Sequence, residues 1–128
     1  MIKIQNYCVI KKQRTIFGQL QSNIMKQEVT FGETIKKLRE NKGYTLKELA
    51  QALGIDTSML GKIEKNSRRP TKLLIEKLST LLEINEKSLT ITFLSDEVAY
   101  QILNEDYASE VLKVAEEKVK YLKAKKKI

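Results

Sequence analysis

Basic side chains gather in the middle of the chain. The segment from Thr57 to Lys72 holds five cations and a single anion, Glu64. The cations are Lys62, Lys65, Arg68, Arg69 and Lys72. This density of lysine and arginine suits a surface that contacts phosphate groups, but a solvated basic face has the same composition. Composition alone leaves both interpretations open.

The groups that most enzymes need are scarce. The 128 residues include no histidine and one cysteine, Cys8, which removes the commonest general base and rules out an internal disulfide. There is no P-loop, and the acidic residues are scattered, mostly beside lysines. We therefore predict that the protein is not an enzyme and needs no metal or other cofactor. With no apolar run long enough for a signal peptide or a membrane span, we expect a reducing, cytoplasmic setting and no membrane partner.

The formal charge of +8 is unevenly distributed. Residues 1–29 carry five cations and one anion, residues 30–94 carry twelve and eight, and residues 95–128 carry seven of each. The positive excess therefore lies outside the C-terminal segment.

The elements that would position the basic segment are predicted to be helices. Five glycines and one proline are few, and from Thr30 onward apolar residues recur at three- and four-residue spacing. Thr30 with Glu33, and Thr45 with Glu48, have the spacing of capping boxes. The inward residues of the first four helices are expected to be Ile35 and Leu38; Leu46, Leu49, Ala50 and Leu53; Leu60 and Ile63; and Leu74, Leu78 and Leu81.

Turn residues separate these helices. Gly43 is expected to end the first helix, at 31–41, and Gly54 the second. Asp56 caps the third, Pro70 and Thr71 precede the fourth, and a shorter fifth helix starts at Asn85. The second and third helices are thus joined by a three-residue turn.

The segment from Tyr44 to Pro70, YTLKELAQALGIDTSMLGKIEKNSRRP, follows GETIKKLR at 32–39. Together they resemble the helix-turn-helix of the lambda-repressor-like, or Xre-type, DNA-binding family. The resemblance spans residues 30–94. It implies an all-α fold: a compact five-helix lambda-repressor-like domain with a helical C-terminal extension. The small Ala50 and the turn at Gly54 fit two closely crossing helices.

In this family the third helix, here 56–66, enters the major groove. The resemblance implies that its outward residues contact bases, and these are Thr57, Ser58, Gly61 and Lys62. Lys62 can donate to guanine O6 and N7, whereas hydroxyl groups discriminate less sharply between bases. Many family members carry Gln at position 57 and a polar residue at 61, so the target sequence cannot be inferred.

The resemblance also implies phosphate contacts from the cap of the second helix and from the loop after the third. The candidates are Thr45, Lys47, Lys65, Asn66, Ser67, Arg68 and Arg69. For Lys47, Arg68 and Arg69, ordinary solvated charge is the alternative. Arg39 and Glu64 match family positions that commonly form an ion pair, and we interpret them as structural.

The two ends of the chain lie outside the segment that resembles the family. Residues 1–29 form a basic N-terminal arm, or the native start is Met25 and residues 1–24 precede it. Residues 95–128 predict a short helix followed by a longer one whose apolar stripe needs a partner, either the protein's own core or a second chain. The stripe consists of Val111, Ala115, Val119 and Leu122.

These features predict a sequence-specific regulator of transcription, of repressor or controller type, that binds double-stranded DNA. We expect a homodimer on a pseudo-palindromic operator, joined through the fifth helix around residues 84–93 or through the C-terminal stripe. The alternative is an antitoxin-like or coactivator-like module that binds a protein partner through its C-terminal helices.

Overall fold

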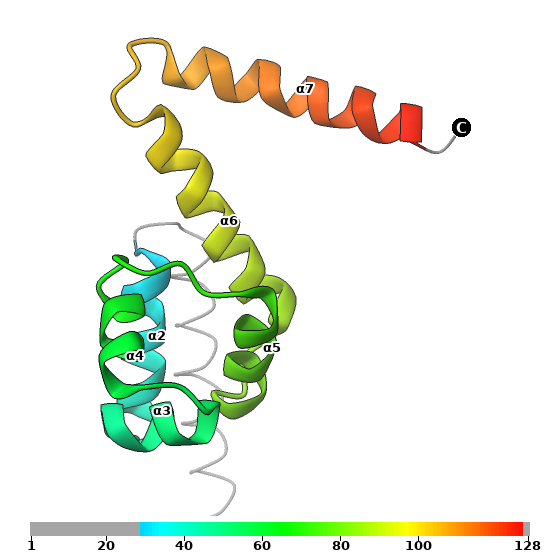
Figure 1. Cartoon of the computed structure of the whole chain (residues 1–128). Helices are drawn as coiled ribbons and strands as arrows, with labels where there is room; N and C mark the ends of the chain where they lie inside the picture. Colours follow the sequence, from blue (N-terminus) through cyan, green and yellow to red (C-terminus); the bar gives the residue numbers. More distant parts are fainter. Residues whose placement is uncertain (1–28, 127–128) are drawn as a thin grey trace, which may run out of the picture. The chain divides into compact units, whose positions relative to one another are not determined.

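The computed structural model describes residues 29–126, which form six α-helices (Figure 1). They are α2 (Phe31–Asn41), α3 (Leu46–Leu53), α4 (Thr57–Glu64), α5 (Lys72–Leu81), α6 (Glu86–Ile102) and α7 (Ala108–Lys126). The described residues divide into one compact unit that ends at Asp96 and a second that begins at Glu97. Cys8, Met25 and nearly all of the predicted N-terminal arm lie outside the described residues. The all-α prediction is confirmed.

Side-chain caps start the first helices of the domain. The Thr30 hydroxyl accepts from the Glu33 amide, and the Glu33 carboxylate accepts from the Thr30 amide, so this capping box is complete. Thr45 accepts from the Glu48 amide at 3.1 Å, but no return bond from the Glu48 side chain accompanies it. Asp56 occupies the N-cap position of α4 without the side-chain hydrogen bond that we expected. Its extended backbone alone therefore sets the start of α4.

The core of the first unit consists of apolar side chains from α2 to the first turns of α6. Its buried members are Phe31, Ile35, Leu38, Leu49, Ala50, Leu53, Leu60, Ile63, Leu74, Ile75, Leu78, Leu82, Ile84 and Leu89. Leu46 and Leu81, also expected inside, are partly buried against it, and so is Ile55. Each fully buried Leu or Ile contributes roughly 1.5–3 kcal/mol of transfer free energy. Packing of α4 on α2 and α3 fixes the position of α4 (Figure 1).

The prediction for the region after Asn85 was wrong in one respect. A shorter fifth helix and a separate short helix were expected, but α6 runs without a break from Glu86 to Ile102. No glycine or proline interrupts this stretch. The hydroxyl of Ser95, where the pattern changes, donates to the Thr92 carbonyl at 3.0 Å, within the same helix. The second unit therefore begins inside a continuous helix.

The C-terminal half of α6 supplies a cap for α2. Asp96 Oδ2 accepts a hydrogen bond from the Phe31 amide at 2.6 Å. The rings of Phe31 and Phe93 pack edge to face, 5.4 Å between centroids. Partial burial raises the pKa of Asp96, the hydrogen bond from Phe31 lowers it, and the charge of Glu33 raises it, with a net upward shift. Residues 65 positions apart in the sequence thus hold α6 against the start of α2.

The raised pKa of Asp96 predicts a pH-dependent stability. Because the folded state holds this proton more tightly than the unfolded state, the contribution is present below the ordinary aspartate pKa and is lost as pH rises through the folded pKa. Asp96→Asn keeps an oxygen acceptor for Phe31 and removes the charge. We expect its stability relative to wild type to increase between acidic and neutral pH in urea unfolding. The exposed control Asp106→Asn should show no such trend, and a pH-independent effect of Asp96→Asn would contradict the assignment.

Candidate nucleic-acid interface

The two faces of α4 differ sharply in character. Leu60 and Ile63 are fully buried against the core. On the other side, Thr57, Ser58 and Lys62 are exposed and Gly61 is half-buried. The outward face thus offers two hydroxyl groups and one ammonium group on eight residues of helix, a length of about 12 Å at 1.5 Å per residue. A helix with its side chains is about 10–12 Å across, which matches the width of the DNA major groove, about 12 Å.

The start of α3 lies beside the middle of α4. A Cβ atom at Gly61 would meet Leu46 Cδ2 at 3.6 Å, an ordinary van der Waals distance. Thr45 and Lys47, the neighbours of Leu46, are both exposed. The structure therefore brings these two candidate residues close to the outward face of α4.

A Schellman motif ends α4, and it involves two of the predicted phosphate contacts. The Asn66 amide donates to the Ile63 carbonyl at 3.1 Å, and the Ser67 amide donates to the Lys62 carbonyl at 2.9 Å. Asn66 has φ of +62°, a left-handed conformation that asparagine tolerates better than most residues. The Ser67 hydroxyl also donates to the Lys62 carbonyl, at 3.1 Å. Both side chains thus have internal roles that the sequence analysis missed, although asparagine after a helix was a usable signal.

Asn66 also ties the end of α4 to the start of α2. Its Oδ1 accepts from the Gly32 amide, and its Nδ2 donates to the Thr30 hydroxyl, both at 2.9 Å. A Cβ atom at Gly32 would clash with the Glu64 carbonyl oxygen and lie 2.7 Å from Asn66 Oδ1. The close approach of the two helices therefore requires glycine at position 32.

An ion pair joins the last turn of α2 to the last residue of α4. Arg39 Nε lies 3.0 Å from Glu64 Oε2, and Arg39 Nη2 lies 3.1 Å from Glu64 Oε1, so the pair is bidentate. Arg39 Nη1 also donates to the Tyr44 carbonyl at 2.9 Å. The two side chains are only 12% and 5% exposed. Arg39 therefore links α2, the turn before α3 and the end of α4.

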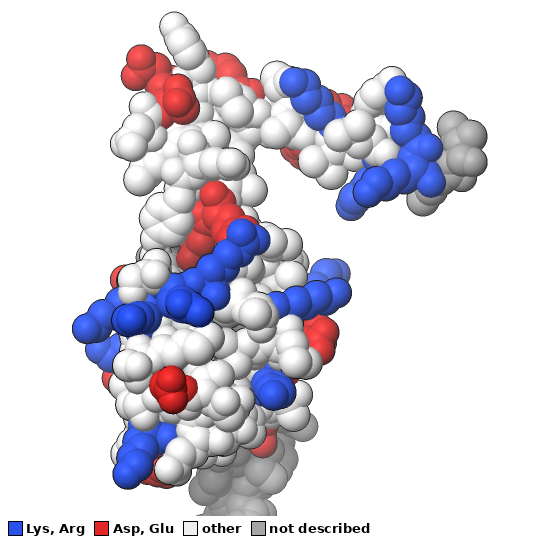
Figure 2. Space-filling model, in the orientation of Figure 1, with Lys and Arg blue, Asp and Glu red and all other residues white. Residues whose placement is uncertain are grey.

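The loop between α4 and α5 carries the basic surface. Lys65, Arg68, Arg69 and Lys72 are exposed there, and Figure 2 shows lysine and arginine side chains gathered over this connection. The Arg69 guanidinium lies 5.7 Å from the centroid of the Phe93 ring, so α6 helps to orient one of these cations. This basic loop continues from the C-terminal end of α4, whereas Thr45 and Lys47 lie near the middle of that helix.

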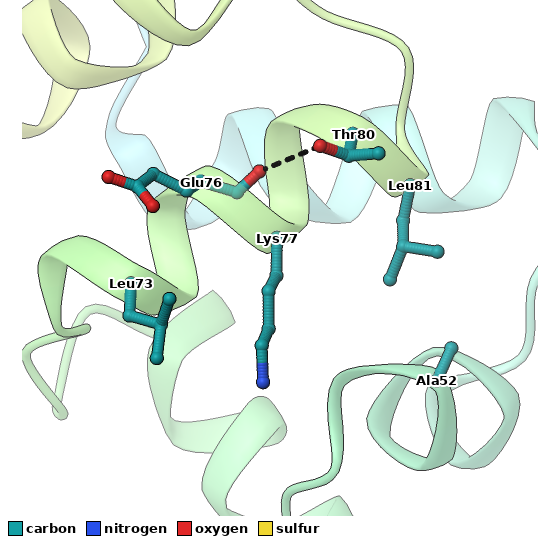
Figure 3. A pocket seen from close by; sticks show the side chains of 6 residues that line it. All are labelled: Ala52, Leu73, Glu76, Lys77, Thr80 and Leu81. Carbon is teal, nitrogen blue, oxygen red and sulfur yellow. Dashed lines mark hydrogen bonds between the residues drawn. The ribbon is translucent and has the colours of Figure 1, made fainter.

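Two hollows in the first unit lie away from the outward face of α4. One, of about 350 Å³, is lined by Ala52 of α3 and by a group of α5 side chains (Figure 3). The Thr80 hydroxyl there donates to the Glu76 carbonyl at 3.2 Å, within the helix itself. The other, of about 590 Å³, has Ile75 and Phe93 in its wall and Arg69 at its edge. Both linings include polar side chains, among them Glu76 and Lys77 in the first hollow and Arg69, Lys72 and Thr90 in the second.

Comparison with known proteins agrees with this geometry. Residues 35–89 match the family described as Helix-turn-helix. The chain is 39% identical over 59 residues to the uncharacterized HTH-type transcriptional regulator YazB of Bacillus subtilis, covering 46% of this chain and 86% of YazB. The chain belongs to the lambda-repressor-like, or Xre-type, helix-turn-helix family.

Other similar proteins are matched over different shares of their length. The HTH-type transcriptional regulator SutR of Escherichia coli is 41% identical over 51 residues, which cover 40% of this chain but only 29% of SutR. Among solved structures, the restriction-modification controller protein C.AhdI of Aeromonas hydrophila is 36% identical, covers 46% of this chain and 89% of its own, and has a TM-score of 0.44. The chain thus matches its curated relatives over the DNA-binding module.

The matched relatives are named as transcriptional regulators, which confirms the prediction that the chain belongs to a family of regulators and not of enzymes. Within the described residues, no group of three or more Cys, Asp or Glu side chains is arranged to hold a metal ion. None of the described helices combines the length and apolar character needed to cross a membrane.

Gly32 provides a direct test of the contact between α2 and α4. Gly32→Ala should lower the free energy of unfolding by about 1–3 kcal/mol because the added methyl group meets the Glu64 backbone. The matched control is Gly61→Ala, where the methyl group has room and the helix gains about 0.5–1 kcal/mol. Urea unfolding followed by circular dichroism measures both. Equal effects of the two substitutions would contradict the close approach.

The ion pair provides a second test. Arg39→Ala leaves the buried Glu64 carboxylate without its cation and should cost about 3 kcal/mol of stability. Glu40, 3.9 Å from Arg39 and 55% exposed, is the matched control, and Glu40→Gln should change stability by less than about 0.5 kcal/mol. A loss below about 1 kcal/mol for Arg39→Ala would show that the pair does not hold α4 in place.

Proposed function

We propose that this protein is a sequence-specific regulator of transcription that acts in the cytoplasm, binds double-stranded DNA and inserts α4 into the major groove. The observation that carries the proposal is the exposed polar face of α4, held on a buried ion pair and flanked by a basic loop. In this arrangement Thr57, Ser58, Gly61 and Lys62 face the base edges. Lys62 contributes the strongest discrimination, since an ammonium group can donate to guanine O6 and N7.

Phosphate contacts come from both sides of α4. Thr45 and Lys47 at the start of α3 contact one stretch of backbone, and Lys65, Arg68 and Arg69 contact another. Asn66 and Ser67 act mainly by shaping the loop, because their side chains bond to Gly32, Thr30 and the Lys62 carbonyl.

A homodimer on a pseudo-palindromic operator fits this DNA-binding surface best. One α4 of eight residues reaches only a few base pairs, so useful specificity needs two copies in successive major grooves, about 10 base pairs apart. With roughly 6–10 phosphate contacts per dimer, affinity should fall about 10³- to 10⁵-fold between 50 and 200 mM salt. Whether the protein represses, activates or controls a restriction-modification system depends on the genes beside its operator.

Site selection from random duplex DNA, followed by affinity measurements, tests the proposal. Lys62→Ala should relax selection at one base position of each half-site, at a cost of about 1–3 kcal/mol. Arg68→Ala should weaken binding to all sequences alike. It should also reduce the slope of the logarithm of affinity against the logarithm of salt concentration by about 0.9 for each phosphate contact removed. Lys37→Ala, which removes an exposed lysine of α2, serves as the control, and this variant should bind DNA like wild type. Failure to recover any consensus sequence would contradict specific DNA reading.

A second candidate, a protein-interaction module, is favoured by the exposed apolar residues of the second unit. In that case α6 and α7 would bind another protein, as in an antitoxin-like or coactivator-like subunit. The double substitution Arg68→Ala and Arg69→Ala separates the two roles. It should abolish DNA binding while leaving any protein partner bound through α7.

A further inference from the structure

Helix α7 exposes apolar side chains along its whole length. None of its 19 residues is buried, and six large apolar side chains are between 44% and 60% exposed. They are Val111, Leu112, Val114, Val119, Tyr121 and Leu122. In proteins most of the stability of a helix comes from tertiary packing of its apolar face, and a contiguous apolar surface marks an interaction site. The helix therefore needs a partner surface.

The apolar residues form a row suited to another helix. Val111, Ala115, Val119 and Leu122 follow one another at intervals of four, four and three residues, the spacing at which helices interlock. Ala115 is the smallest member and lies near the middle of the row, where two backbones could approach closely. A second helix of similar length would cover this row.

The charges of the second unit are separated along the sequence. The 13 positions from Glu105 to Glu117 hold five acidic residues and one lysine, Lys113, and the nine positions from Lys118 to Lys126 hold five lysines and no acid. Figure 2 shows acidic side chains near the connection from α6 to α7 and lysines toward the end of α7. Lys120 Nζ is 3.6 Å from both Glu116 Oε1 and Glu117 Oε1, so pairing within the helix occurs at the junction of the two halves.

We propose that α7 pairs in antiparallel orientation with α7 of a second copy of this chain. The first half of α7 itself holds three acids, Glu110, Glu116 and Glu117, and one lysine. An antiparallel pair sets this half of each helix against the lysine-rich half of the other, whereas a parallel pair places like charges together. The pairing is isologous, with a two-fold axis near Glu117 that puts Ala115 opposite Val119 and Val111 opposite Leu122. The inference rests on the proposed dimeric function and identifies its interface.

Disulfide trapping in the full-length chain, with Cys8→Ser as background, tests the orientation. In the antiparallel pair, Val111 of one copy faces Leu122 of the other. Two Val111 residues lie eleven positions apart along the axis, about 16 Å, well beyond the roughly 7 Å that a disulfide can span. A mixture of Val111→Cys and Leu122→Cys chains should therefore oxidise to a mixed disulfide about tenfold faster than either chain oxidises alone.

The trapping experiment has two outcomes that overturn the inference. Rapid homodisulfide formation by Val111→Cys alone would indicate a parallel pair. Absence of any disulfide in every combination would mean that α7 binds a different protein or its own chain. Circular dichroism of each variant verifies that the helices remain folded.

Charge reversal tests the electrostatic part of the argument. Changing Lys118, Lys120 and Lys123 to Glu removes most of the positive charge from the second half of α7 and leaves Lys125 and Lys126 at its end. The dimer dissociation constant from sedimentation equilibrium should then rise about tenfold or more. Adding Glu110→Lys, Glu116→Lys and Glu117→Lys to the same chain exchanges the two halves and should restore self-association. The control with Lys36, Lys37 and Lys77 changed to Glu alters the net charge equally and should leave the dissociation constant unchanged. An equal rise in the control would overturn the proposed charge pairing.

DNA binding by the same variants separates this inference from the proposed function. A dimer could bind a palindromic site selectively and yet form no α7 disulfide. That result would overturn the proposed interface but not the proposed DNA binding. A mixed disulfide in a chain that binds all DNA sequences alike would support the α7 pair and overturn the proposed reader.

Discussion

The bidentate contact between Arg39 and Glu64 is the constraint on which the rest of the domain depends. Both groups are withdrawn from water, so each requires the other, and the geometry of the guanidinium fork leaves little freedom in the distance between α2 and α4. Arg39 Nη1 donates a hydrogen bond to the Tyr44 carbonyl and so fixes the turn before α3. One side chain thereby sets the relative positions of all three helices that form the candidate DNA-binding surface.

A second set of contacts fixes the end of α4 and the loop after it. Asn66 bonds to Gly32 and Thr30, and the absence of a side chain at Gly32 allows the backbones to approach. On the adjacent side, Phe93 contacts both the ring of Phe31 and the guanidinium of Arg69. The basic loop is therefore held by α2 and by α6. A phosphate-binding loop held in this way loses less conformational freedom on binding than a mobile one.

Much of this fold follows from patterns that are local in the sequence. Caps at Thr30 and Thr45, a left-handed glycine at Gly54 and apolar spacing of three and four residues predicted the first helices correctly. Contacts between distant residues were not predictable in the same way. The hydrogen bond from Phe31 to Asp96 spans 65 positions, and nothing in the local sequence around Asp96 distinguishes a cap for another helix from a solvated acid. The break expected after Ser95 failed for a related reason, since a change in apolar pattern reflects a change of neighbours and not the end of a helix.

The candidate site shows the same division. The exposed positions of α4 follow from helical periodicity, and the resemblance to known family members indicated their role. The internal bonds of Asn66 and Ser67 depend on the left-handed turn that ends α4, which only the three-dimensional arrangement reveals. These bonds give the two residues an internal role beside the phosphate contacts predicted for them.

The central claim is that α4 reads the major groove, and methylation interference on a selected duplex tests it most directly. Methyl groups at guanine N7 lie in the major groove, whereas those at adenine N3 lie in the minor groove. We expect N7 methylation to block binding at two clusters about 10 base pairs apart. The Lys62→Ala protein should become insensitive to methylation at one guanine of each cluster. Interference confined to adenine N3, or spread evenly along the duplex, would contradict the claim.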